Sequence, residues 1–164
     1  MFFAQMMLYA SVLVLGDAPA TSQKPQPQPA IKAEQKATQG EPAELEEKEI
    51  DGVKVIAIEA NLISYTNAER ARYGLPPLEV DKELMESARE HAAWMTRHRS
   101  MVHTTRPVAE NIAMGQPHSS DAVQAWMNSS GHRANILNPG HRRIGVAAYR
   151  TASGVIFWCQ QFRQ

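Results

Sequence analysis

The chain has 164 residues, in which 17 lysine and arginine residues are balanced by 17 aspartate and glutamate residues. This length favours one domain with additional segments, and the balanced charge gives no reason to expect nucleic acid or an anionic membrane as a partner. The single cysteine, Cys159, excludes a disulfide within the chain. A domain of this kind must therefore depend on its apolar core for stability.

The first 20 residues have the pattern of a secretory signal peptide. Residues 2–16 are almost entirely apolar and carry no charge, a length that matches a signal-peptide core and is shorter than a membrane-spanning helix. The sequence Ala18-Pro19-Ala20 has the small residues of a cleavage site, which predicts cleavage before Thr21 and no stable transmembrane segment afterwards. No lysine or arginine precedes the apolar run, so an uncleaved N-terminus that anchors the chain is the alternative.

Residues 21–54 form a second compositional block, rich in proline, glutamine, glutamate and lysine and without aromatic residues. Such a stretch cannot bury enough surface to offset the entropy of ordering it. The composition predicts a disordered spacer, extended where proline alternates with glutamine, which would hold a domain of residues 55–164 away from a membrane or wall.

Helices are predicted in the first part of this domain. Apolar residues recur at helical spacing in a stripe made of Ile58, Leu62, Tyr65 and Ala68, and Gly74 is a natural residue to end that helix. A second helix is predicted from the N-cap Asp81 to about His98. A third is predicted to start at residues 119–121, and a short fourth helix over residues 132–137.

The C-terminal part changes to a period of two. Residues 144–149 alternate as in a strand, residues 152–154 form a turn, and residues 155–159 are apolar on both faces, which indicates a strand covered on both sides. Helices followed by this hairpin predict an α+β fold, with a small sheet sandwiched between helices.

Three residues are candidates for chemistry. His103 lies in the loop after the second helix, Glu110 lies in a segment with strand character, and His132 lies at the start of the short fourth helix. The positive end of a helix disfavours the imidazolium form of a histidine, and a neutral imidazole is what a metal ion or a general-base role requires. The spacings of 7 and 22 residues differ from the pair of histidines four residues apart in a helical zinc site, so spacing alone does not predict a metal site.

Other polar and aromatic residues have simpler interpretations. His91 is expected to be a hydrogen-bonded core residue, because it lies on the apolar face of the second helix. Cys159 is expected to be a small buried hydrophobe, and Ser129 and Ser130 are expected to be helix caps. Surface positions are expected for His98, His118 and His141, and core positions for Trp94, Trp126 and Trp158.

Over residues 57–162 the sequence resembles the CAP/SCP superfamily, which contains cysteine-rich secretory proteins, antigen 5 and plant pathogenesis-related proteins. The GHRANIL sequence at 131–137 resembles the bacterial branch in particular. The matching positions occur in the order of the family and are residues 67–70, 73–78, 84, 88–92, 103, 109–112, 125–137, 144–147 and 157–162.

The resemblance implies a three-layer α-β-α sandwich with a mainly antiparallel sheet and a secreted or cell-envelope location. It also implies a cleft that contains two histidines and two glutamates in eukaryotic members. His103, Glu110 and His132 match three of these positions, and Ser129, with Asn128 beside it in the cleft, stands where the second glutamate is expected. The resemblance does not imply one reaction for the family, since a fold does not determine a function.

Three functions are compatible with these residues. The first is an extracellular binding module that holds zinc or another divalent cation through His103 and His132, supported by Glu110, with no cofactor required for the fold. The second is a hydrolase that uses Glu110 or His132 as its catalytic group, although no nucleophile motif or helical zinc motif is present. The third is a lipid-binding, sterol-binding or structural protein. The ligand, whether a lipid, a peptide or a cell-envelope component, is not specified by the sequence.

Overall fold

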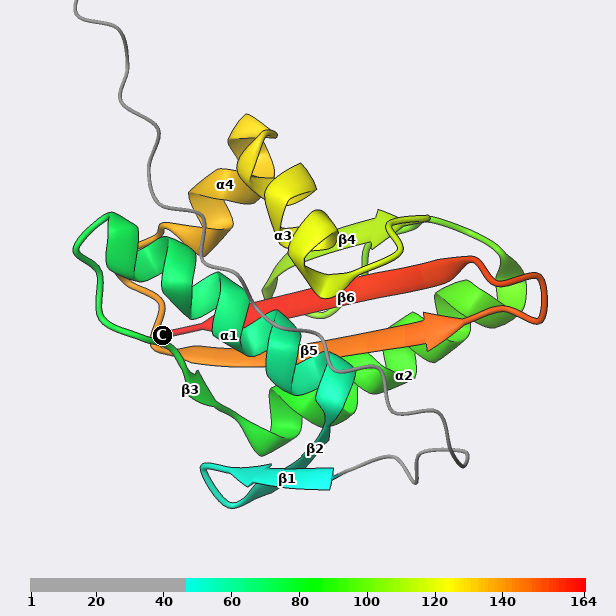
Figure 1. The fold of residues 1–164 in the computed structure, drawn as a ribbon, viewed down its shortest axis with the longest axis horizontal. Coiled ribbons are helices and arrows are strands. Elements are labelled where there is room, and N and C mark those ends of the chain that lie inside the picture. The colour runs from blue at the N-terminus through cyan, green and yellow to red at the C-terminus, as the bar shows by residue number, and fades with distance from the viewer. Residues whose placement is uncertain (1–46) are drawn as a thin grey trace, which may run out of the picture. The chain divides into compact units, whose positions relative to one another are not determined.

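A computed structural model describes residues 47–164 and places helices on both faces of a four-stranded sheet (Figure 1). The elements follow the chain in this order: β1 (Glu47–Ile50), β2 (Val53–Ile56), α1 (Ala57–Arg72), β3 (Glu79–Val80), α2 (Lys82–His98), β4 (Ala109–Met114), α3 (Ser119–Met127), α4 (Ser130–Ile136), β5 (Arg143–Arg150) and β6 (Ile156–Arg163).

The sheet has the strand order β3-β5-β6-β4. The short β3 pairs with β5 in parallel, whereas β5 with β6 and β6 with β4 pair in antiparallel fashion. The sheet is therefore mainly antiparallel, as predicted, and β4 is an edge strand. In its register Glu110 lies opposite Gln161, which places the candidate glutamate at this edge of the sheet.

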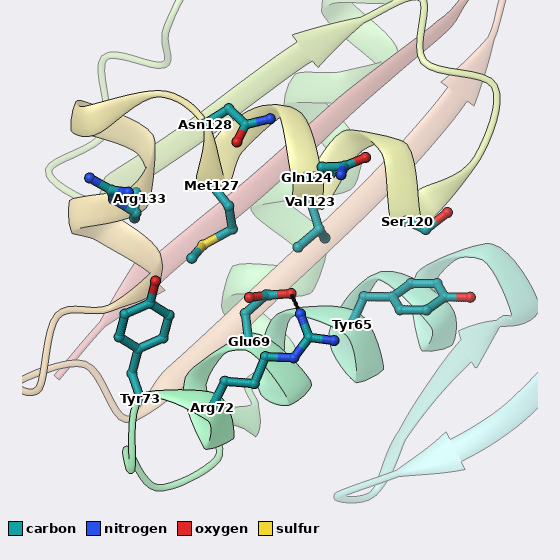
Figure 2. Close-up of a pocket in the computed structure, with 10 residues that line it drawn as sticks. All are labelled: Tyr65, Glu69, Arg72, Tyr73, Ser120, Val123, Gln124, Met127, Asn128 and Arg133. Atoms are coloured by element: carbon teal, nitrogen blue, oxygen red, sulfur yellow. Dashed lines mark hydrogen bonds and ion pairs between the residues drawn. The ribbon is translucent and has the colours of Figure 1, made fainter. Parts of the chain in front are cut away.

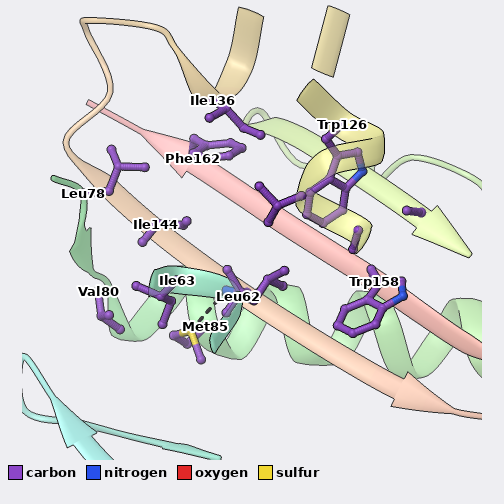
Figure 3. Packing of buried hydrophobic residues seen from close by; sticks show 14 of the residues in the cluster. Leu62, Ile63, Leu78, Val80, Met85, Trp126, Ile136, Ile144, Trp158 and Phe162 are labelled. Carbon is purple, nitrogen blue, oxygen red and sulfur yellow. Dashed lines mark hydrogen bonds between the residues drawn. The ribbon is translucent and has the colours of Figure 1, made fainter. Parts of the chain in front are cut away.

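Two separate groups of apolar side chains cover the two faces of the sheet. On one face α1, α3 and α4 pack around Trp126, Trp158 and Phe162 (Figure 3). On the other face α2 contributes Ala88, Ala92 and Met95, which pack against Phe157 and Cys159 of β6. Successive β6 side chains therefore point to opposite faces and are buried on both. This arrangement confirms the α-β-α sandwich.

Gly145 shows how closely α2 approaches the sheet. A Cβ atom at this position would lie 2.1 Å from the backbone carbonyl carbon of Leu84, near the start of α2. Only a glycine permits this contact between helix and strand backbones. The start of α2 is also fixed from within, because Asp81 accepts a hydrogen bond from the Leu84 amide at 2.9 Å.

The structure differs from the predicted linker over residues 47–54, where β1 and β2 form a hairpin. Asp51 and Gly52 both have positive φ angles, 51° and 76°, as a tight two-residue turn requires. Val55 is fully buried, and the Asp51 carboxylate accepts a hydrogen bond from the Val80 amide at 2.7 Å. An Asp-Gly pair between residues of alternating polarity was the signal for this hairpin. The predicted signal peptide and the remaining linker residues lie outside the described part of the chain.

The buried face of α1 also differs from the predicted stripe. Leu62 is buried as expected, but Tyr65 is 45% exposed. The face turned to the core carries three polar residues instead, Glu59, Thr66 and Arg70. Each of them has hydrogen-bond partners inside the protein, so burial does not leave their polar groups unsatisfied. A search for apolar periodicity does not detect a face of this kind.

The remaining helices match their predictions closely. α2 ends at His98, where Arg99 adopts a left-handed conformation, and α3 starts at Ser119. α4 begins at Ser130, so His132 lies within its first turn. Within residues 47–164, no helix combines the length and apolar composition needed to cross a membrane.

Candidate functional site

The carboxylate of Glu110 is the centre of a buried polar cluster on the α2 side of the sheet. Its side chain is only 3% exposed. One oxygen, Oε1, accepts a hydrogen bond from the Thr104 amide at 2.9 Å and lies 2.9 Å from Nδ1 of His103. The other, Oε2, accepts a hydrogen bond from the Gln161 side-chain amide at 2.9 Å and contacts the Cys159 thiol at 3.6 Å. The burial of this charge is therefore compensated by donors to both oxygens.

The contact with Glu110 orients His103. Because an ionised carboxylate only accepts hydrogen bonds, Nδ1 of His103 must carry the proton. In the neutral form of His103 the other ring nitrogen, Nε2, is then left with its lone pair, and the side chain is 58% exposed. His103 follows α2 in the 99–108 loop and presents this nitrogen at the surface.

A second histidine, His91, adjoins the same carboxylate. Its Nε2 atom lies 2.8 Å from the carbonyl oxygen of Val102 and 3.7 Å from Oε1 of Glu110. The sequence predicted a hydrogen-bonded core histidine on α2. The hydrogen bond is present and the side chain is only 12% exposed, but the residue also adjoins the candidate site, a position that the predicted set of site residues missed. Only its position on the helix that leads into the His103 loop could have indicated this.

His132 approaches from α4, beyond the edge strand β4. Burial lowers the pKa of His132, and a positive charge on His103 lowers that pKa further. His132 is therefore neutral at and somewhat below neutral pH.

Asparagine and glutamine side chains hold α4 against this edge of the sheet. The side-chain amide of Asn111 donates to the His132 carbonyl at 3.1 Å. The side-chain amide of Asn135 donates to the Asn111 side-chain oxygen at 2.9 Å and to the Glu110 carbonyl at 3.2 Å. Asn111 also bonds Gln160, which reaches α1. His132 thus occupies a position that is fixed through backbone contacts with the strand that carries Glu110.

Cys159 is not activated by this cluster. Burial raises the pKa of the Cys159 thiol, and the charge of Glu110 raises it further. A neutral buried thiol is a poor nucleophile and a poor metal ligand. The residue is buried in mid-strand, as predicted, and has in addition become a weak hydrogen-bond donor to Glu110.

The two residues expected beside the cleft have separate positions. Ser129 is the N-cap residue of α4, although its side chain makes no capping hydrogen bond. Asn128 lines a cavity of about 500 Å³ between α1 and the α3–α4 segment (Figure 2). The lining of that cavity includes neither His103, Glu110 nor His132. A smaller cavity of about 270 Å³ adjoins His103 and His91.

Two further predictions were wrong. His141 was expected at the surface but is only 7% exposed, stacks on Phe162 and contacts the Asn135 carbonyl through Nδ1. Trp94 was expected in the core but is 39% exposed and stacks against His98. Trp126 and Trp158 are buried, as predicted.

The donor set limits the kind of metal site that is possible. Within residues 47–164, no group of three or more histidine, cysteine, aspartate or glutamate side chains is arranged to hold one ion. A structural zinc site closed by four protein ligands therefore does not fit this part of the chain.

Comparison with known proteins connects this arrangement to a family. The sequence profile of the cysteine-rich secretory protein family, CAP, matches residues 63–162. The uncharacterized protein YkwD of Bacillus subtilis is 38% identical over 125 residues, which cover 66% of this chain and 48% of the relative. The chain spans about half or less of the length of the curated relatives that it matches.

Solved structures share the fold. An outer surface protein of Borrelia burgdorferi superposes with a TM-score of 0.58 at 24% identity, covering 63% of this chain and 89% of that protein. An extracellular protein with an SCP domain from Bacillus anthracis superposes with a TM-score of 0.55 at 24% identity, covering 65% of this chain and 40% of that protein. At this level of identity the likeness concerns the fold alone.

Proposed function

The chain belongs to the cysteine-rich secretory protein (CAP) family, and from that premise we propose that it is an extracytoplasmic binding module that holds a divalent cation, zinc in the first instance, through His103 and His132. The observation that carries this proposal is the 2.9 Å contact between Nδ1 of His103 and the buried carboxylate of Glu110. Histidines that bind metals donate their other ring N–H group to a carboxylate in this way, which fixes the tautomer and makes the free nitrogen more basic.

The state of His132 supports its role as the second ligand. Metal ions bind neutral imidazole, and protons compete for the same lone pair. Because the pKa of His132 is lowered by burial and by the charge of His103, this imidazole stays available at a pH where an ordinary histidine is partly protonated.

Glu110 has a supporting role in this proposal. Both of its oxygens already accept hydrogen bonds, and its side chain is almost completely buried. It is therefore suited to orient His103 and to balance its charge, and it is poorly placed either to bind the ion or to take a proton from water. This geometry weakens the hydrolase hypothesis, which needs Glu110 as a base.

A bound divalent cation would supply a Lewis-acidic centre with open positions for water or for an oxygen atom of a ligand. With two imidazoles from the protein, the affinity should be modest and should depend on pH. The proposed extracytoplasmic location is supported by the signal-peptide pattern of residues 1–20 and by the relatives that are described as extracellular or outer-surface proteins.

Thermal unfolding with added zinc tests the proposal. A ligand that binds only the folded state stabilises it by RT ln(1 + [L]/Kd), which is about 2.7 kcal/mol at a concentration of 100 Kd. We expect a rise in Tm for the wild-type chain that is lost in His103→Ala and in His132→Ala. His118→Ala is the matched control, because His118 is exposed and makes no side-chain capping bond at the start of α3. An unchanged wild-type Tm, or a rise that survives both substitutions, would reject the two-histidine site.

A further inference from the structure

The cavity of about 500 Å³ between α1 and the α3–α4 segment is separate from the residues of the proposed metal site (Figure 2). We call it the α1–α3 groove. Tyr65 of α1 and Tyr73, the C-cap residue of that helix, stand at its two ends. Val123 and Met127 of α3 provide its apolar part, and Arg72 and Arg133 provide its positive charges. From this lining we propose that the groove binds an extended acidic peptide segment of a partner protein.

The aromatic residues indicate a recognition surface. Tyr73 is 57% exposed, and Tyr65 is exposed as well, although both are large enough to add substantially to a core. Tyrosine and arginine are the residues most enriched at the energetic centres of protein interfaces, because they offer a large contact area together with a polar end. Two of each line this one groove.

The charges favour an anionic partner. Arg72 is held by Glu69 at 2.6 Å, so this pair is nearly neutral. Arg133 is exposed and forms no ion pair with any carboxylate of residues 47–164. The groove therefore carries one uncompensated positive charge, on α4 at the Tyr73 end. A carboxylate placed there would form a charge-assisted hydrogen bond with the guanidinium group.

The polar rim favours a peptide over an acyl chain. Ser120, Gln124 and Asn128 lie along the α3 wall, and an acyl chain would cover these groups without offering them hydrogen bonds, which carries a free-energy cost. A peptide backbone presents N–H and C=O groups that match such side chains. An apolar side chain of the same peptide would occupy the space beside Val123 and Met127.

The length of the groove also fits a short extended peptide. Tyr65 lies on α1 and Tyr73 caps its C-terminal end eight residues later, which corresponds to about 12 Å along the helix axis. An extended peptide rises about 3.3 Å per residue, so about four residues span the groove. The shortest matching ligand thus places one or two apolar side chains between the tyrosines and a carboxylate next to Arg133.

A synthetic octapeptide in which glutamate and leucine alternate tests this inference on the full chain. Binding is followed by NMR shifts of the side-chain amides of Gln124 and Asn128, and by fluorescence polarisation of labelled peptide. We expect saturable shifts of these amides, and binding about fivefold weaker in Arg133→Gln, since an exposed charge pair contributes up to about 1 kcal/mol. Tyr73→Ala should weaken binding by at least as much.

Matched controls come from the end of β5, outside the α1–α3 groove. Arg150→Gln and Tyr149→Ala replace exposed residues of the same types on β5 and should leave the peptide affinity unchanged. Equal Tm values for variant and control show that the fold is intact. The inference is overturned if a peptide with glutamine in place of glutamate binds equally well, if decanoate shifts the same amides while the acidic peptide does not, or if Arg133→Gln and Arg150→Gln have the same effect. None of these outcomes depends on zinc binding.

Discussion

Arg70 and Glu110 are two buried charges of the same domain with different surroundings. The Arg70 guanidinium is fully buried and donates only to backbone carbonyls, those of Pro76, Ile136, Asn138 and His141. The Glu110 carboxylate is almost as deeply buried, but it is surrounded by side chains of His103, His91, Cys159 and Gln161 and by one backbone amide.

The difference separates a charge with a structural role from a charge in the proposed site. Backbone carbonyls cannot change their protonation state, and those around Arg70 lie in the loop after α1, at the end of α4 and in the loop between α4 and β5. Arg70 therefore fixes these segments to one another. Glu110 is bonded to His103, a titratable and largely exposed group, so its charge can affect events at the surface. A buried charge indicates a functional site only when its hydrogen-bond partners reach solvent and can themselves change their protonation state.

The largest expected effect comes from Arg70→Ala. Removing the guanidinium leaves several buried carbonyls without donors, and losing one member of a buried charged network costs about 3–5 kcal/mol of unfolding free energy. Urea denaturation measures this loss. Arg72→Ala, on the same helix but largely exposed, is the matched control; it removes only the exposed ion pair with Glu69 and should change stability by no more than about 1 kcal/mol. Similar losses in both variants would mean that the carbonyl contacts of Arg70 contribute little.

Glu110→Gln should have a smaller effect on stability and a clear effect on the site. The substitution keeps the shape but places an amide donor where donors already converge, which should cost about 1–3 kcal/mol. Loss of the carboxylate behind a metal-binding histidine typically lowers metal affinity by about 10- to 100-fold. Calorimetric titration with zinc measures that ratio. The control Glu90→Gln removes an exposed carboxylate that pairs with Arg106; it should leave the zinc affinity unchanged and change the unfolding free energy by no more than about 1 kcal/mol. A stable Glu110→Gln protein with wild-type zinc affinity would show that Glu110 does not support His103.

Stability should decrease as the pH falls from about 7 toward 5. Burial lowers the pKa values of His132 and His141, and the charge of Arg70 lowers that of His141 further, while the Asn135 carbonyl acts in the opposite direction. The unfolded chain therefore binds more protons than the folded chain below the ordinary histidine pKa of about 6.5, so the unfolding free energy rises with pH in this window. Denaturation midpoints between pH 5 and 7 measure the slope.

Replacing His141 should reduce this slope. His141→Gln removes one of the two titrating groups, whereas His98→Gln changes an exposed histidine and should leave the slope as it is. An unchanged slope in His141→Gln would show that the burial of this ring is not linked to folding.

The smallest expected effect on stability concerns the exposed ion pair between Glu69 and Arg72 on α1. Glu69→Gln removes the ion pair with Arg72, which should cost about 0.2–1 kcal/mol and disappear at high salt. Urea denaturation at low and high salt measures it. A loss close to that of Arg70→Ala would contradict the view that burial, and not charge alone, gives Arg70 its importance.

Much of the fold could be predicted from the sequence, because local chemistry specified it. Asp81 is the N-cap of α2 as expected, and the alternating residues of β5 and the two-sided β6 form the predicted hairpin. The buried face of α1 could not be predicted from apolar spacing, since Thr66 and Arg70 are stabilised by partners far away in the sequence.

The candidate site could be predicted only in part. His103 and Glu110, which the family resemblance assigned to one cleft, are in contact. The contribution of His91 depends on how the loop after α2 folds back, and the burial of His141 depends on its packing against Phe162. Both are tertiary contacts that no local pattern encodes. Asn128, assigned to the cleft by its neighbours in sequence, lines the α1–α3 groove instead.

The most direct measurement of the central claim is NMR of the histidine side-chain nitrogens during a zinc titration. In the free protein, the proton of His103 should reside on Nδ1, hydrogen-bonded to Glu110. Zinc should then shift Nε2 of His103 and one ring nitrogen of His132, and leave the resonances of His98 and His118 unchanged. Coordination by other histidines, or no shift at saturating zinc, would contradict a metal site built from His103 and His132.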